Sequence, residues 1–99
     1  MRIGGIKMWR EPNGREFTIA LYRTPDCVEN DYDEIDADES ERVRSWLAPY
    51  RRWDFCEMSG LIQFYGDMQQ AEEIGTLFLL AFAPASTIAC TRVAGIGLT

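Results

Sequence analysis

The sequence predicts an α+β domain in which an antiparallel sheet of about four to five strands carries two helices on one face. Apolar residues recur at every second position in several short segments, as in half-buried strands, and at every third and fourth position in two longer segments, as in helices. The chain has 99 residues, of which 46% are hydrophobic, so one domain with one core is expected over residues 1–99.

The N-terminal residues predict a β-hairpin. β-favouring side chains and two glycines occupy residues 3–10, and the following Pro12-Asn13-Gly14 has the backbone preferences of a reversing turn. Residues 15–23 then alternate between an apolar face, made of Phe17, Ile19 and Leu21, and a more polar face. We therefore expect a returning strand that buries one of its faces.

The next segment is acidic and leads into a helix. Nine of the sixteen residues from Asp26 to Glu41 are carboxylates and none is basic, so residues 26–38 are expected to form a solvated, mobile loop. A helix should begin around Asp36 or Asp38, because acidic residues suit the free N–H groups of a helix start. Its apolar face consists of Val43, Trp46, Leu47 and Tyr50, and Pro49 should close it.

The C-terminal half predicts a second hairpin, a second helix and a last strand. Residues 53–58 and 61–65 are short strands joined at Ser59-Gly60, and Asp67 is a cap for a helix that continues toward Pro84. Because Gly75 weakens that helix, a helix ending there and a strand from Thr76 is the alternative for residues 76–83. Residues 87–93 are β-compatible and are expected to form a last strand or a frayed end.

After the extra N-terminal strand, the predicted order is strand, helix, strand, strand, helix, strand. This order is that of the split β-α-β, or ferredoxin-like, two-layer sandwich. No internal repeat and no Gly/Ser-rich linker divides the chain. We therefore expect a ferredoxin-like domain with an additional N-terminal strand.

Composition excludes several function classes. The net charge of −6 disfavours direct binding to nucleic acid or to anionic membranes. The chain has no histidine, which removes the commonest general base and the commonest zinc ligand. Its three cysteines are far apart and odd in number, so a reducing cytoplasm is expected, and Cys56 and Cys90 are expected in the core. We expect no enzymatic activity, no cofactor and no membrane span.

The aspartates of the acidic stretch do not match a calcium-binding loop. Counted from Asp31 in an EF-hand register, the sixth position is Asp36, where glycine is required, and the twelfth is Arg42, where a bidentate glutamate is required. No metal site is therefore expected. The arginines that follow weaken the negative electrostatic field of this stretch. Arg42 and Arg44 are expected to pair with Glu39 and Glu41, or to face an acidic partner.

Two interpretations of the acidic stretch stay open: a merely solubilising loop, and a docking surface for a basic partner. In the second, the chain is a non-enzymatic protein-binding module that occupies a basic, nucleic-acid-binding surface of a protein, a role that suits a phage-encoded inhibitor of host defence. Apolar anchors would come from Tyr32 and Ile35. The predicted partner-binding residues are Asp31, Tyr32, Asp33, Glu34, Asp36, Asp38 and Glu39.

Two alternatives from other classes remain. One is a small ligand-binding or enzymatic domain with a pocket between sheet and helices. The other is a subunit that forms homo-oligomers through an open sheet face or an edge strand.

Overall fold

The computed structural model describes residues 1–28 and 34–82. Six elements occur in these residues, in an order that agrees with the sequence patterns. They are β1 (Gly5–Arg10), β2 (Glu16–Tyr22), α1 (Ala37–Leu47), β3 (Trp53–Cys56), β4 (Leu61–Tyr65) and α2 (Met68–Phe82). The expected last strand, residues 87–93, lies outside the described residues.

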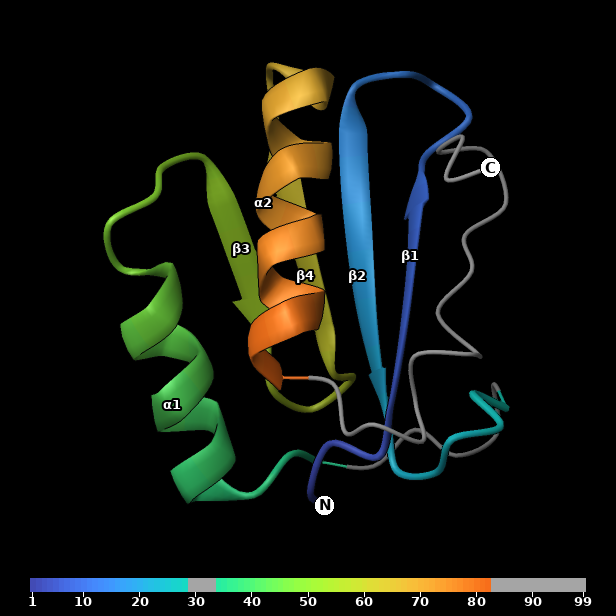
Figure 1. The fold of residues 1–99 in the computed structure, drawn as a ribbon, viewed down its shortest axis with the longest axis vertical. Coiled ribbons are helices and arrows are strands. Elements are labelled where there is room, and N and C mark those ends of the chain that lie inside the picture. Colours follow the sequence, from blue (N-terminus) through green and yellow to red (C-terminus); the bar gives the residue numbers. More distant parts are fainter. Residues whose placement is uncertain (29–33, 83–99) are drawn as a thin grey trace.

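The four strands of the described residues form one antiparallel sheet in the order β1-β2-β4-β3 (Figure 1). Since β4 pairs with both β2 and β3, these two strands run parallel to each other, and α1 is the crossover between them. The extra strand β1 pairs with the free edge of β2. The α+β class is therefore confirmed, with a four-stranded sheet and two helices, while the ferredoxin-like arrangement stays a prediction.

Helix α2 packs on one face of the sheet, and the buried side chains of α1 join the same core. The expected apolar face of β2 lies there, with Phe17, Ile19 and Leu21 fully buried. In Figure 1, α2 lies in front of the sheet and runs roughly along the strands, and α1 lies to one side. The indole of Trp46 on α1 meets the ring of Phe78 on α2 edge-on, with the ring centroids 5.4 Å apart. One core thus joins the two helices and the sheet.

Strand β2 is buried on its second face as well, which its alternating pattern did not predict. Thr18, Ala20 and Tyr22 are each at most 1% exposed. The aromatic ring of Trp9 on β1 and the side chain of Leu61 on β4 pack against this cluster from the neighbouring strands. These neighbours contribute to the burial of Ala20 and Tyr22 on this face.

Helix α2 runs through Gly75 without a break, so the alternative of a strand from Thr76 is wrong. A Cβ atom built on Gly75 would lie 2.7 Å from Cε2 of Phe17 and 3.1 Å from Sδ of Met8. The glycine therefore lets the helix approach β1 and β2 closely, and the packing gained offsets its poor helix propensity. Neither described helix is long and apolar enough to cross a bilayer.

Candidate functional site

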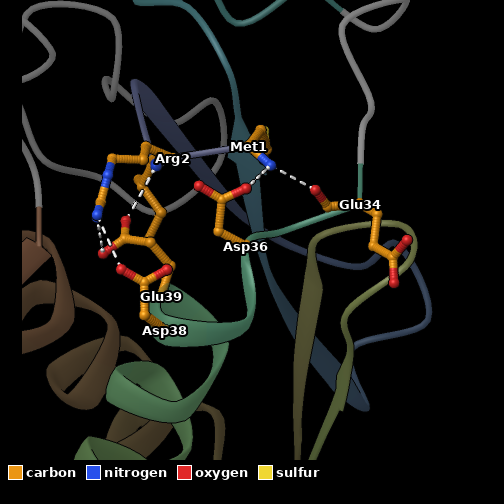
Figure 2. Close-up of polar contacts among 7 residues, drawn as sticks. Met1, Arg2, Glu34, Asp36, Asp38 and Glu39 are labelled. Atoms are coloured by element: carbon orange, nitrogen blue, oxygen red, sulfur yellow. Dashed lines mark hydrogen bonds and ion pairs between the residues drawn. The ribbon is translucent and has the colours of Figure 1, made fainter.

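The acidic segment, defined as residues 34–41, is held in place by the N-terminal residues of the chain (Figure 2). The Met1 ammonium group donates hydrogen bonds to the backbone oxygen of Glu34 at 2.5 Å and to Oδ1 of Asp36 at 2.6 Å. The backbone N–H of Asp36 in turn donates to the Met1 carbonyl oxygen at 2.9 Å. These contacts fix the chain just before α1.

Helix α1 begins at Ala37, which confirms the expected start around Asp36 or Asp38. The role of Asp36 differs from the expected one, however. It is the N-cap residue, but its side chain makes no capping hydrogen bond because its carboxylate binds the Met1 ammonium group. Asp38 and Glu39 lie in the first turn, where negative charge interacts favourably with the helix dipole.

Glu39 is the structural centre of the acidic segment. Its side chain is only 7% exposed, and Oε2 accepts a hydrogen bond from the backbone N–H of Ile3 at 3.1 Å. Its other oxygen lies 3.5 Å from Nη1 of Arg2 and 3.6 Å from Nε of Arg42. The expected pair of Arg42 with Glu39 is thus confirmed, and the buried carboxylate has both cationic and N–H partners.

Arg44 turns away from the acidic segment instead of pairing with Glu41 or Glu39. It donates from Nε to Oε1 of Glu57 at 2.7 Å, and its guanidinium lies 4.9 Å from the ring centroid of Phe55. These contacts tie α1 to strand β3 and the turn after it. The hydrogen bond from Arg44 lowers the pKa of the Glu57 carboxyl, since it stabilises the ionised form.

Asp38 forms a solvent-exposed ion pair with Arg2. The Asp38 Oδ2 atom accepts from Nη2 of Arg2 at 2.8 Å, and both side chains are more than 60% exposed, at 64% and 68%. Desolvation acts to raise the pKa of the Asp38 carboxyl, but the Arg2 charge and the backbone N–H of Glu39 outweigh it and lower that pKa. Asp38 therefore stays ionised at neutral pH.

The predicted partner-binding residues are brought together only in part. Asp31, Tyr32 and Asp33 lie outside the described residues. Glu34 is exposed, and Figure 2 shows its carboxylate turned away from the Met1 ammonium group. Ile35, expected as an exposed apolar anchor, is 4% exposed and belongs to the core, so that expectation is wrong. Its backbone N–H donates to the Glu57 carbonyl at 3.1 Å, which ties this part of the chain to the turn after β3.

The surface around the acidic segment carries both signs of charge. A hollow of about 480 Å³ is lined by Arg2, Asp38, Glu39, Glu41, Arg42 and Ser45. The carboxylates of Glu34 and Glu41 are exposed, and that of Asp36 is 45% exposed even though it binds the ammonium group. Basic side chains thus stand among the carboxylates, as the arginines in the sequence had suggested.

A second concave region was not anticipated from the sequence. The arginine cleft, as we call it, has a volume of about 350 Å³ and lies between the loop after α1, the end of β4 and the first turns of α2. The one sequence signal for it is the adjacent pair Arg51 and Arg52 after Pro49. Its lining residues are Pro49, Tyr50, Arg51, Arg52, Tyr65, Asp67, Gln70 and Ile74.

The cysteines differ from expectation. Cys56 is an exposed free thiol, because the neighbouring Phe55 occupies the core-facing position on β3. The hydrogen bond with the Ser59 side chain lowers the pKa of the Cys56 thiol. Cys27 is a buried free thiol, and Cys90 lies outside the described residues. Within residues 1–28 and 34–82, no three Cys, Asp or Glu side chains are grouped so that they could hold a metal ion.

Comparison with protein-family models, with curated proteins and with solved structures finds no significant match to this chain.

Proposed function

We propose that the chain is a non-enzymatic protein-binding module, and that it docks with the acidic segment onto a basic surface of a protein partner. The observation that carries the proposal is the anchoring of this segment. Carboxylates that remain exposed, such as those of Asp36 and Asp38, are held by the N-terminal ammonium group and by Arg2. The segment thus combines accessibility with a fixed geometry.

Fixed geometry matters because ordering a flexible, charged loop on binding costs affinity. Each side chain immobilised at an interface costs about 0.5–1.5 kcal/mol. Here Ile35 and Glu39 are already buried, so the backbone between them is ordered before a partner arrives. A partner therefore meets a preformed array, and the net charge of −6 steers a basic surface toward it.

The arrangement of charges also specifies the partner. Arg2 and Arg42 line the hollow beside Asp38 and Glu41, so a uniformly basic groove would meet repulsion there. The best complement is a basic surface that presents one acidic side chain to the hollow, with arginines or lysines around it. A surface that normally holds nucleic acid fits the basic part, and a phage-encoded inhibitor acting in the cytoplasm remains our proposal for the biological setting.

Variants chosen from the structure test this proposal. The triple change Glu34→Gln, Asp38→Asn and Glu41→Gln removes exposed charges. It breaks the exposed Asp38–Arg2 pair, but it leaves the anchoring residues Asp36 and Glu39 in place. The protein is used to capture its partner from the cells that encode it, and the partner is then purified. We expect the triple variant to bind that partner at least about tenfold more weakly, a loss of about 1.4 kcal/mol.

A matched control removes the same charge elsewhere. Glu16→Gln, Asp54→Asn and Glu73→Gln lie on β2, β3 and α2, away from the acidic segment. This control variant should bind like the unmodified protein. Equal binding by both triple variants, or equal weakening, would rule out docking through the acidic segment.

The proposal includes the ferredoxin-like arrangement. In its support, β2, α1, β3, β4 and α2 follow the strand, helix, strand, strand, helix order of that plan. A homo-oligomer is the alternative that exposed Leu77 and Leu80 on α2 favour, being 51% and 73% exposed. Light scattering on the purified chain distinguishes a monomeric module from such an assembly.

A further inference from the structure

The chain has nine arginines, and those of the described residues differ in whether a carboxylate of the same chain pairs with them. Four of them, Arg2, Arg10, Arg42 and Arg44, form ion pairs with carboxylates of the same chain. Among the described residues, Arg51 and Arg52 form no ion pair with a carboxylate, and neither does Arg15 in the β1–β2 turn, but Arg51 and Arg52 are adjacent and line the same cleft. In a chain with 16 acidic and 10 basic residues, two adjacent arginines without a partner mark a place where positive charge is available to a ligand.

The backbone of Arg52 has an unfavourable conformation that places its side chain. Its φ is +61°, in the left-handed region where glycine is the favoured residue. The Arg52 carbonyl accepts from the Tyr65 N–H at 2.9 Å, which ties this conformation to β4. An arginine that adopts this strained conformation suggests that its side chain has a functional role.

Gly66 makes room for the Arg52 side chain. A Cβ atom on Gly66 would lie 2.8 Å from Nη1 and 3.3 Å from Cδ of Arg52. Gly66 itself has a φ of +91°, so a side chain at this position would be strained, and it would also displace the Arg52 guanidinium. The Arg52 side chain therefore lies over Gly66, just before α2, and lines the arginine cleft.

The other groups of the cleft define what it can hold. Asp67 is engaged by the helix start, since its Oδ1 accepts from the backbone N–H groups of Gln69 and Gln70 at 3.0 and 3.3 Å. Those N–H groups already have an acceptor, so they cannot bind an anionic ligand. The positive charge in the cleft therefore comes from the arginines. Tyr50 and Tyr65 supply aromatic walls, and the Gln70 side chain supplies a neutral donor and acceptor.

We propose that the arginine cleft binds a small phosphate ester, with the phosphate group on Arg51 and Arg52 and a hydroxyl-bearing part toward Asp67 and Gln70. The guanidinium fork matches the oxygens of a phosphate, and the Asp67 carboxylate accepts from a ligand hydroxyl but repels a second anionic group. The volume of about 350 Å³ is at the lower end of the range for small-molecule sites.

This site is separate from the acidic segment. The acidic segment lies at the N-terminal end of α1, whereas the arginine cleft follows its C-terminal end. An 11-residue helix is about 16 Å long. Loss of phosphate-ester binding and loss of protein docking can therefore be observed independently, each with its own variants.

Titration of the full ¹⁵N-labelled chain with glycerol 3-phosphate tests the proposal, with glycerol and with sodium chloride at matched ionic strength as controls. We expect saturable amide shifts confined to residues 50–52 and 65–70, with a dissociation constant in about the millimolar range or tighter. Inorganic phosphate should shift the same amides less strongly. Shifts that are spread over the surface, that do not saturate, or that sodium chloride reproduces would overturn the proposal.

Arginine variants give the second arm of the test. Arg51→Gln and Arg52→Gln should each raise the dissociation constant at least about tenfold, since each removes a charge-assisted hydrogen bond. Arg15→Gln removes the same charge in the β1–β2 turn and should leave the constant within about twofold. Arg52→Gly relieves the left-handed backbone, so it should fold at least as stably as the unmodified chain and yet bind weakly. Full binding by Arg52→Gly, or equal loss in Arg15→Gln, would refute the site.

Discussion

Replacing Glu39 by Ala should destabilise the protein more than replacing an exposed carboxylate of the acidic segment, such as Glu41. The substitution removes the acceptor of the Ile3 N–H, and Ile3 is itself 7% exposed, so a buried donor is left without its partner. Such a loss costs about 1–3 kcal/mol. The ion pairs to Arg2 and Arg42, at 3.5 and 3.6 Å, involve largely exposed guanidinium groups and add about 0–1 kcal/mol. The total is about 1–4 kcal/mol.

Urea denaturation followed by tryptophan fluorescence measures this difference, provided that the slope with urea is unchanged. Glu39→Gln keeps an oxygen that accepts from the Ile3 N–H and should cost about 1 kcal/mol or less. Glu41→Ala, which alters an exposed neighbour, should stay within about 0.5 kcal/mol. If Glu39→Ala is as stable as Glu41→Ala, or if Glu39→Gln is as damaging as Glu39→Ala, the reasoning about the buried acceptor is refuted.

Three further changes test other parts of the structure. Gly75→Ala should lower the unfolding free energy by about 0–2 kcal/mol. The new Cβ would lie 2.7 Å from Cε2 of Phe17, and this overpacking outweighs the gain of about 1 kcal/mol in helix propensity. A variant that is clearly more stable in urea than the unmodified protein would contradict this expectation. Ser59→Ala should raise the pKa of the Cys56 thiol, so the pH midpoint for alkylation of Cys56 should move upward. An unchanged midpoint would show that the hydrogen bond with the Ser59 side chain does not lower this pKa. Glu57 has a lowered pKa in the folded state, so its contact with Arg44 stabilises the protein above the ordinary pKa of about 4.5 and is lost as the pH falls. The stability difference between the unmodified protein and Glu57→Gln should therefore narrow below pH 4.5, and a difference that stays constant down to pH 2 would contradict this account.

The local patterns in the sequence predict the elements well. Alternation in residues 15–23 and the spacing of Val43, Trp46 and Leu47 correspond to β2 and α1, since side-chain periodicity follows directly from backbone geometry. The acidic residues before α1 correctly mark where that helix begins. Gly75 was ambiguous, because helix propensity is a local quantity and the close approach of Phe17 is not.

The contacts of the site could not be predicted in the same way. The pair of the Met1 ammonium with Asp36 joins residues 35 positions apart, and no periodic pattern encodes it. Ile35 appeared available as an anchor because its neighbours in sequence are charged, yet the fold places it in the core. Arg44 was expected to pair within its own helix or to face an acidic partner, but it pairs with Glu57, which lies beyond β3. The arginine cleft likewise forms only when the loop after α1 meets the end of β4.

The central claim is that the anchored acidic segment docks onto a basic protein surface. The most direct test is the association rate constant with the captured partner, measured at low salt and at about 0.15 M salt, where the Debye length is about 8 Å. We predict that the rate falls at least about tenfold over this range for the unmodified protein, and much less for the triple variant at Glu34, Asp38 and Glu41. A rate that is independent of salt and equal in the two proteins would contradict the claim.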